Sequence, residues 1–235
     1  MFETPPAQPR PPRAVLFDVD GTLVDTNDLH TAAWREAFRR FGIELEFDAI
    51  RSQVGKGGDN LVPTLVPDID EERHEALEAL RAEIFERDYL PRAVPFPGVR
   101  DLFERIAEEG LRIVLASSSH KAEVDFHMNL IACTDLVSAI TTRDDVEHSK
   151  PCPDIFAAAL AKVAPLGAGE VVVVGDTPWD VKAAAKLGIR TIGFRSGGFP
   201  DQALLEAGAA ELFDGPADLL ARFDSSILAR AHADA

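Results

Sequence analysis

Short segments in which nearly every residue is apolar recur along the chain, separated by stretches with helical periodicity. They lie at 14–17 (AVLF), 111–116 (LRIVLA), 171–175 (VVVVG) and 190–194 (RTIGF), with weaker ones near 136–140 and 211–213. Strands that are apolar on both sides are typical of parallel sheets, because helices cover both faces of such sheets. We therefore expect these segments to form a parallel sheet.

Helical patterns fill the intervals between these strands. They lie at 98–109, 120–130, 153–164, 179–187, 201–207 and 216–230. Alternation of strands and helices predicts an α/β fold with a Rossmann-like parallel sheet core and helices on both faces. In such folds ligands bind beyond the carboxyl ends of the strands, so the residues that follow each strand are candidates for the site.

One region, 27–94, interrupts the alternation with helices and no clear strand. The segment NDLHTAAWREAFRRFG places His30, Trp34, Phe38 and Phe41 along one stripe, which indicates an amphipathic helix that ends near Gly42. A second helix is predicted in DEERHEALEALRAEIFERDYL, with Leu77, Leu80 and Ile84 facing inward. These helices predict an all-helical cap domain inserted after the first strand.

The chain therefore divides into three parts in this interpretation. Residues 1–12 are rich in proline and predict a disordered tail, 13–26 and 95–235 form the α/β core, and 27–94 form the cap. Linkers near 24–27 and 91–97 would serve as hinges between cap and core. The glycine-rich segment VGKGGDN, 54–60, is expected to be a loop of the cap.

Composition narrows the class of protein. The 235 residues carry a formal net charge of −16, which disfavours a nucleic-acid partner, because binding to a phosphate backbone needs clustered lysine and arginine. Two cysteines form no disulfide framework and suit a reducing compartment. The apolar runs are too short to span a bilayer, and the N-terminal segment lacks the apolar core of a secretory signal. We expect a soluble cytoplasmic protein without a membrane partner, as a monomer or a homodimer.

Two carboxylates directly follow the first strand, in the sequence FDVDGTLVDT. Asp18 and Asp20 are spaced by two and would project to the same side of extended backbone. Their repulsion is offset by a cation or a shared proton, and Mg²⁺ is a cation that prefers oxygen ligands. Gly21 would allow a sharp turn, and Thr22 could donate to a neighbouring carboxylate. The alternative is a turn with acids that cap a helix.

Further polar residues follow other predicted strands or precede helices. Ser117 comes at the end of LRIVLA, Lys150 lies just before a helix that could open at Pro153, and Asp176 and Asp180 follow VVVVG. Taken singly, each has an alternative as a helix cap or a solvated side chain. Their order along the chain would gather all of them at one edge of the sheet, which caps alone do not explain.

On these motifs the chain resembles the haloacid dehalogenase-like hydrolases, in the phosphatase and β-phosphoglucomutase branch with a small helical cap. The matching elements are DVDGT (18–22), Ser117, Lys150 and GDTPWD (175–180), within a resemblance that covers about 13–225. It implies an Mg²⁺-dependent phosphatase that acts on a small phosphomonoester, of the sugar phosphate or phosphoglycolate type, through an aspartyl-phosphate.

The resemblance also implies roles for the core residues. Asp18 would be the nucleophile, and Asp20 would protonate the leaving oxygen and then activate water. Asp18, the backbone carbonyl of Asp20, Asp176 and Asp180 would hold Mg²⁺. Ser117, Ser118 and Lys150 would bind the phosphoryl oxygens, with Lys150 balancing the charge of nucleophile and phosphate. Dehalogenases of this family lack the second aspartate, so Asp20 favours phosphoryl chemistry.

The cap would select the substrate, and here alternatives stay open. His30 and Trp34 in DLHTAAW are similar to a β-phosphoglucomutase pattern, although His30 could instead belong to the apolar stripe of its helix. Gly55 and Lys56 lie in the glycine-rich loop, where Lys56 could reach a second anionic group of the substrate. Mutases tend to carry an arginine in this loop, and this chain has none there, which favours a phosphatase over a sugar phosphomutase. A non-catalytic protein that binds phosphate or Mg²⁺ would be expected to lack Asp18 or Asp20.

Overall fold

Parallel strands form the central sheet of the computed structural model, which describes residues 11–229. The order is β5 (Val137–Thr141), β4 (Arg112–Ala116), β1 (Ala14–Phe17), β6 (Val171–Gly175), β7 (Arg190–Phe194) and β8 (Glu211–Phe213). All six segments predicted as strands belong to this sheet, which confirms the α/β fold. From β1 the strand order runs to β4 and β5 on one side and to β6, β7 and β8 on the other. Parallel sheets bind ligands at the point where the strand order switches in this way, here beside β1.

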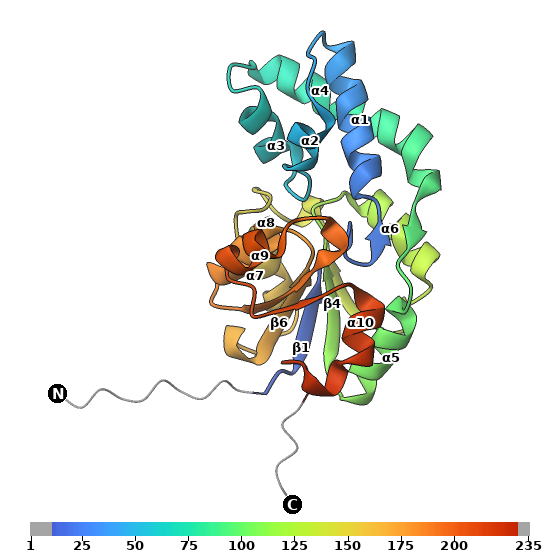
Figure 1. Cartoon of the computed structure of the whole chain (residues 1–235), viewed down its shortest axis with the longest axis vertical. Helices are drawn as coiled ribbons and strands as arrows, with labels where there is room; N and C mark the ends of the chain where they lie inside the picture. The colour runs from blue at the N-terminus through green and yellow to red at the C-terminus, as the bar shows by residue number, and fades with distance from the viewer. Residues whose placement is uncertain (1–10, 230–235) are drawn as a thin grey trace, which may run out of the picture.

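Helices cover both faces of the sheet (Figure 1). Val15 and Phe17 of β1 pack in one hydrophobic cluster, and Ala14 and Leu16 pack in another, because successive side chains of a strand point to opposite faces. The first cluster includes residues of α5 (Val99–Glu108), α6 (Lys121–Ile131) and α10 (Pro216–Ala221). The second includes residues of α7 (Asp154–Ala161) and α8 (Pro178–Ala185), and α9 (Asp201–Ala207) packs against α8.

One predicted core helix is wrong in length. The pattern predicts a helix over 216–230, whereas α10 ends at Ala221 and a 3₁₀ turn follows at Phe223–Ser225. The hydroxyls of Ser225 and Ser226 donate to the carbonyls of Arg222 and Phe223, at 2.8 and 2.7 Å. Serine side chains that bond nearby backbone compete with helix propagation, and the apolar spacing does not reveal this competition.

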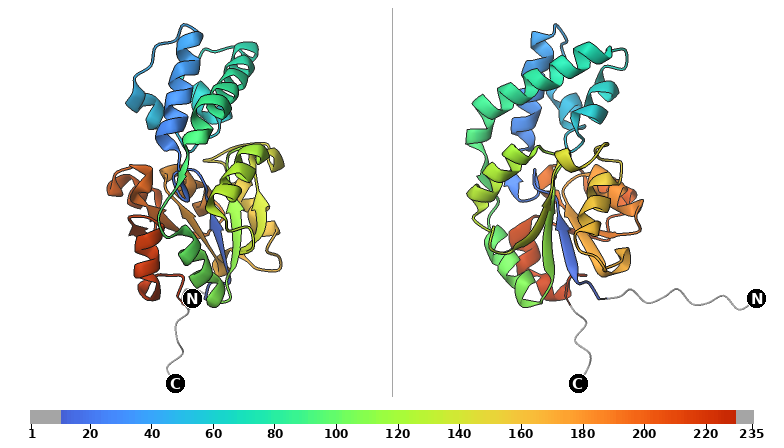
Figure 2. Two further views of the ribbon diagram at one scale, coloured as in Figure 1. Left: turned by 90° about the vertical axis from the view of Figure 1, so that its right-hand side faces the viewer. Right: turned by 180° about the vertical axis from the view of Figure 1, so that it is seen from behind.

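The cap contains four α-helices within the described residues, and they surround a cluster of their own above the sheet (Figures 1 and 2). They are α1 (Asn27–Arg40), α2 (Phe47–Arg51), α3 (Gly58–Leu65) and α4 (Glu71–Ile84). The predicted stripes of α1 and α4 face this cluster. Helices α2 and α3 were not predicted, because they are too short for a 3.6-residue period to show. Helix α3 begins at Gly58, so the predicted loop 54–60 is wrong in its last three residues.

The two predicted hinge segments lie side by side. Strand β2 (Val24–Asp25) pairs antiparallel with β3 (Val94–Pro95), below a π-helical turn at Phe85–Tyr89 and a 3₁₀ turn at Leu90–Arg92. Val94 is therefore a strand residue, and the prediction that 27–94 holds no strand is wrong at its last position. The pairing joins the outgoing and returning chains into one narrow connection between cap and core.

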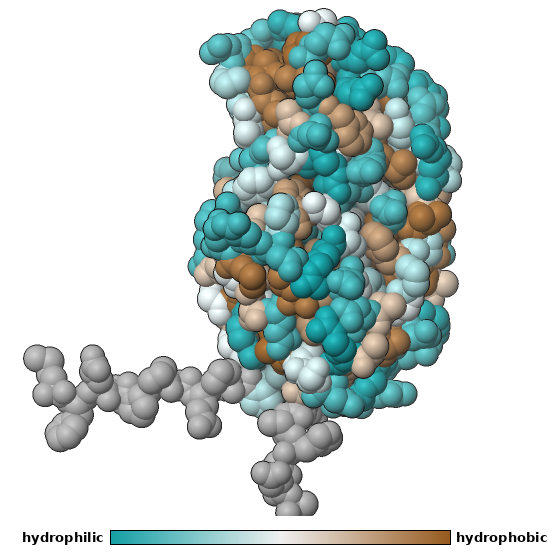
Figure 3. Space-filling model, viewed as in Figure 1, coloured by the Kyte–Doolittle hydropathy of each residue, from teal (hydrophilic) through white to brown (hydrophobic). Residues whose placement is uncertain are grey.

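The outer surface is mixed in character, as Figure 3 shows for one face: hydrophobic residues are interrupted by hydrophilic ones. Among the described residues, no helix is both long and apolar enough to cross a bilayer. Of the predicted disordered tail, 1–12, residues 1–10 lie outside the described part of the chain. Both ends of the described chain lie at the side of the core that faces away from the cap (Figure 1).

Candidate active site

Asp18 occupies the first position after β1 and is buried. Its amide donates to the carbonyl of Val174 at 2.9 Å, so the ladder with β6 continues into the site. The chain then turns sharply at Gly21, whose φ of +76° favours glycine. A side chain at Gly21 would also collide with Asn27 and Asp176. Glycine is thus required at the predicted turn both by its backbone conformation and because a side chain would not fit there.

Three buried carboxylates meet beyond β1 and β6. One oxygen each of Asp18, Asp176 and Asp180 lies within 4.8 Å of the others. The ammonium of Lys150 contacts Asp18 and lies 2.6 Å from Oδ1 of Asp180. Thr22 donates to Oδ1 of Asp176 at 2.9 Å and to Oδ2 of Asp18 at 3.3 Å. The sheet edge thus brings together the residues that the sequence placed on separate strands.

Asp180 is both a helix-capping residue and a member of the charged cluster, the two alternatives that the sequence left open. Its Oδ2 accepts from the amide and hydroxyl of Thr177, at 3.0 and 2.6 Å, and closes a capping box at the start of α8. Its Oδ1 faces Lys150. One carboxylate therefore caps a helix and also belongs to the charged cluster.

Burial and mutual repulsion disturb the ionisation of this cluster. Burial raises the pKa of Asp18 well above its usual range, although Lys150 acts in the opposite direction. Burial and the neighbouring Asp180 raise the pKa of Asp176 to about 7. Burial alone would lower the pKa of Lys150, but Asp18 and Asp180 outweigh it and raise that pKa. Burial and repulsion thus oppose full ionisation of the three carboxylates, whose combined charge one ammonium would not balance.

The donor set fits a divalent cation. Three carboxylates face one lysine, so full ionisation leaves a formal charge of −2 in a buried space. Hard oxygen donors of this kind suit Mg²⁺. Gly197 lies against the cluster as well, where a Cβ would collide with Asp176, so backbone approaches closely on this side. Asp18, Asp176 and Asp180 could hold such an ion.

Asp20 lies apart from that cluster, in a network of neutral donors and imidazoles. Its Oδ1 accepts from Thr26 at 2.7 Å and lies 3.0 Å from Nε2 of His30, and its Oδ2 accepts from Ser119 at 2.9 Å. Burial alone would raise the pKa of Asp20, but His30, His127 and the hydrogen bond from Thr26 outweigh it and lower that pKa. Asp20 is therefore held as a carboxylate in this arrangement.

The orientation of His30 follows from a residue that the sequence reasoning missed. The guanidinium of Arg81, on α4, contacts Nδ1 of His30. Arginine offers only donors, so Nδ1 accepts, which leaves Nε2 as the donor to Asp20. The ring of His30 also stacks on Phe85, with centroids 4.1 Å apart. His30 thus belongs both to the buried stripe of α1 and to the site.

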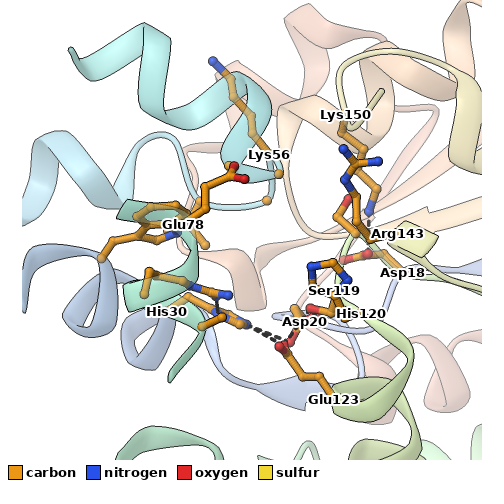
Figure 4. A pocket seen from close by; sticks show the side chains of 18 residues that line it. Asp18, Asp20, His30, Lys56, Glu78, Ser119, His120, Glu123, Arg143 and Lys150 are labelled. Atoms are coloured by element: carbon orange, nitrogen blue, oxygen red, sulfur yellow. Dashed lines mark hydrogen bonds and ion pairs between the residues drawn. The ribbon is translucent and has the colours of Figure 1, made fainter. Parts of the chain in front are cut away.

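A cavity between cap and core contains Asp18, Asp20 and Lys150 in its walls (Figure 4). Core residues of its wall include Ser118, Ser119, His120, Glu123 and Arg143, and cap residues include His30, Trp34, Gly55, Lys56, Glu78 and Arg81. Glu123 and His127 lie one turn apart on α6, and Glu123 accepts from Ser119 at 2.6 Å. Glu123 lies in the first turn of the helix that follows Ser117, and this position in the sequence could have indicated a role for it.

The predicted phosphate-binding serines have different positions. Ser117 is buried, accepts from the amide of Ser119 at 3.0 Å and donates to Oδ2 of Asp20 at 3.4 Å. Ser118 lines the cavity, and its hydroxyl has no hydrogen-bond partner among the described residues. Ser118 and Ser119, but not Ser117, thus belong to the cavity wall.

The predicted cap residues all line the cavity, in different ways. Trp34 is buried, with the Arg81 guanidinium over its ring at 5.3 Å. The ammonium of Lys56 donates to Gln53 at 2.6 Å and lies over the ring of Trp179 at 4.2 Å. Figure 4 shows the Lys56 side chain extending away from Asp18 and Lys150. Lys56 therefore borders the cavity by its backbone and stem, with its charge directed outward.

A family model described as haloacid dehalogenase-like hydrolase matches residues 15–194. The chain belongs to the haloacid dehalogenase-like hydrolase family. A solved hydrolase from Pseudomonas syringae has 32% sequence identity and a TM-score of 0.86, covering 92% of this chain and 99% of that one. The Phosphorylated carbohydrates phosphatase of Thermotoga maritima is 29% identical over 203 residues, which are 85% of this chain and 93% of the relative.

Not every relative has the same length. Protein SUPPRESSOR OF QUENCHING 1, chloroplastic, of Arabidopsis thaliana is 30% identical over 190 residues, which are 78% of this chain but 18% of the relative. The matching unit in this haloacid dehalogenase-like hydrolase thus also occurs inside a much longer protein. The family and the enzyme class predicted from the motifs, a phosphoric monoester hydrolase, are confirmed.

Proposed function

We propose that the chain is an Mg²⁺-dependent phosphatase that hydrolyses a small phosphomonoester through an aspartyl-phosphate on Asp18. The observation that carries the proposal is the buried cluster of Asp18, Lys150, Asp176 and Asp180, with Asp20 in the wall of the same cavity. Phosphoryl transfer depends mainly on positioning and on cationic stabilisation of the transferred group, which this arrangement supplies.

In the first step the carboxylate of Asp18 attacks phosphorus. For this step Asp20 must be in its protonated form, and the bond to the leaving oxygen breaks as Asp20 donates that proton to the oxygen; the proton taken from water in the second step restores it. Lys150, held between Asp18 and Asp180, reduces the repulsion between the anionic nucleophile and the anionic phosphate. Ser118, whose hydroxyl has no partner among the described residues, could donate to a phosphoryl oxygen from the cavity wall. When bound by Asp18, Asp176 and Asp180, Mg²⁺ supplies further neutralisation of the phosphate charge.

In the second step a water molecule attacks the phosphorus, and Asp20 accepts its proton. The bond between Asp18 and phosphorus breaks, and inorganic phosphate leaves. The hydrogen bonds from Thr26 and Ser119, with the contact from His30, keep Asp20 ionised in this structure. This arrangement therefore corresponds to the base form that the second step requires.

A sugar phosphomutase is the second candidate, and the contact between His30 and Asp20 is the observation that favours it. A mutase must retain the phosphoryl enzyme until a second sugar hydroxyl arrives, so control of Asp20 by a cap histidine would suit it. The loop 54–60 lacks an arginine, which favours the phosphatase. Both substrate types would place a phosphoryl group at Asp18 and the remainder of the molecule beneath the cap.

Phosphate release from a panel of small phosphomonoesters, with Mg²⁺, tests the function. The panel contains phosphoglycolate, several hexose phosphates and β-glucose 1-phosphate, and Asp18→Asn serves as the blank. We expect release from at least one member. No release from any member would contradict the phosphatase, and conversion of β-glucose 1-phosphate to glucose 6-phosphate would then identify the mutase.

Substitution of Lys56 tests the contribution of the cap loop. We expect Lys56→Ala to raise KM more than it lowers kcat, because the Lys56 ammonium joins the cavity loop to Gln53 and to the Trp179 ring. Steady-state kinetics on the best substrate of the panel measure both constants, with the exposed Lys162→Ala as the matched control. An unchanged KM would show that Lys56 has no part in substrate binding.

A further inference from the structure

The start of cap helix α3 binds one residue of the core through several hydrogen bonds. The hydroxyl of Ser149 donates to Oδ1 of Asp59 and accepts from the amide of Gly57 at 2.9 Å and from Nδ2 of Asn60 at 3.0 Å. The amide of Ser149 donates to Oδ2 of Asp59 at 3.0 Å, and its carbonyl accepts from Nδ2 of Asn60 at 3.1 Å. Every polar group of Ser149 therefore has a partner in the cap.

This set of contacts among Gly57, Asp59, Asn60 and Ser149, here called the clasp, depends on close approach of backbone. A Cβ at Gly57 would lie 2.6 Å from Cβ of Ser149. A Cβ at Gly55 would lie 2.6 Å from Cγ2 of Thr177, and Gly55 also has a φ of +95°. Gly55 and Gly57 are thus positions where cap meets core, and a merely flexible connection would not need them.

The two core residues that the cap loop contacts adjoin the charged cluster. Ser149 immediately precedes Lys150, and Thr177 lies between Asp176 and Asp180. Ser149 and Lys150 are each about 1% exposed, so their shared peptide segment is covered on all sides. Any displacement of Ser149 moves the backbone from which the Lys150 side chain extends toward Asp18.

We propose that Asp59 and Asn60 are positioning residues that bring Lys150 into its active place when the cap closes. The inference rests on the proposed function, since it assigns the clasp a part in that reaction. When the cap is open, Ser149 loses its partners in the cap to water, and the Lys150 segment gains freedom. When the cap closes, with or without substrate beneath it, the clasp forms and fixes that segment, so that enclosure of a substrate and placement of Lys150 occur together.

The clasp suits this task because of its chemistry. Asp59 brings a carboxylate, and hydrogen bonds to a charged acceptor are about twice as strong as neutral ones. The acceptor pair of Asp59 and the donor amide of Asn60 match the donor and acceptor groups of a single residue. Such a match fixes both the position and the orientation of Ser149, and placement errors of about 1 Å near a reaction centre cost on the order of 10²-fold in rate.

Asp59→Ala tests the proposal, with Asp59→Asn as the conservative variant and Asp68→Ala, an exposed cap aspartate, as the matched control. The first readout is amide exchange at Ser149, measured by NMR without substrate. Loss of the bond to a charged acceptor is expected to accelerate this exchange by about tenfold or more in Asp59→Ala. Asp59→Asn, which keeps one acceptor, is expected to show a smaller acceleration, and Asp68→Ala none.

The second readout is kinetic. We expect Asp59→Ala to lower kcat by roughly tenfold to a hundredfold with a smaller change in KM. The same loss is expected with acetyl phosphate, which is too small to depend on cap contacts but still needs Lys150. We expect Asp59→Asn to recover part of kcat, in agreement with its smaller acceleration of amide exchange at Ser149.

Three results would overturn the clasp. They are unchanged exchange at Ser149 in Asp59→Ala, an effect confined to KM, or full retention of acetyl phosphate turnover. Each of these is separate from failure of the proposed function, which would appear as absence of phosphate release by the wild type. Because the exchange measurement needs no turnover, it tests whether Asp59 holds Ser149 in place even in that case.

Discussion

Asp18→Asn abolishes phosphate release while the protein remains folded. The amide of asparagine cannot attack phosphorus, so the aspartyl-phosphate does not form and turnover is expected to fall by roughly 10⁴-fold or more. The fold tolerates the change because burial already disfavours the charge on Asp18, and Lys150 keeps its contact with Asp180. The measurement is phosphate release on the best substrate of the panel, together with thermal unfolding.

Asp25→Asn is the matched control, because Asp25 lies in the same segment but is exposed. It should retain the activity and melting temperature of the wild type. An Asp18→Asn variant that turns over at a substantial fraction of the wild-type rate would contradict a nucleophilic role for Asp18. A variant that fails to fold would instead show that the carboxylate is needed for the charged cluster to pack.

Removal of divalent cations by EDTA is expected to stop turnover, and excess Mg²⁺ is expected to restore it. Three buried carboxylates face one lysine, and an incoming phosphate adds further negative charge to the same space. Without a second cation, repulsion opposes both substrate binding and attack by Asp18. Full activity after exhaustive chelation would contradict the proposed cofactor and would favour metal-independent chemistry of the dehalogenase type.

Thermal unfolding gives an independent measure of the same site. Mg²⁺ that binds the folded chain alone stabilises it by about 2.7 kcal/mol at a concentration of 100 times Kd, so the melting temperature should rise with Mg²⁺ concentration. In Asp176→Asn, which removes one of the three carboxylates, this rise should be much smaller. An equal rise in both proteins would place the stabilising cation elsewhere.

The sequence by itself determined the sheet and the residues at its edge. Strands buried on both faces must be apolar throughout, so AVLF, VVVVG and their counterparts were visible without any structure. Because parallel strands end at a common edge, the sequence predicts that Asp18 and Asp176 lie close together, with Lys150 joining them from the start of a helix. The helical nature of the cap followed from the apolar stripes of α1 and α4.

Periodicity failed where elements are short or where side chains bond their own backbone. Helices α2 and α3 and the pair β2–β3 are too short to show a period, and the serines after α10 end that helix without a change in apolar spacing. These misses are local, and each follows from a hydrogen bond or a pairing that hydrophobic pattern does not record.

Only the tertiary structure decided which polar groups of the cap meet the core. Arg81 reaches His30 and Asp59 reaches Ser149 across long separations in sequence, and the contact between His30 and Asp20 joins a cap helix to the core. The motif around Asp18 gives no indication of Arg81 or Asp59, because side-chain contacts between two domains depend on how the domains dock. The residues of the core site thus lie in local motifs near strand ends, whereas the contacts through which the cap would control them exist only once the chain has folded.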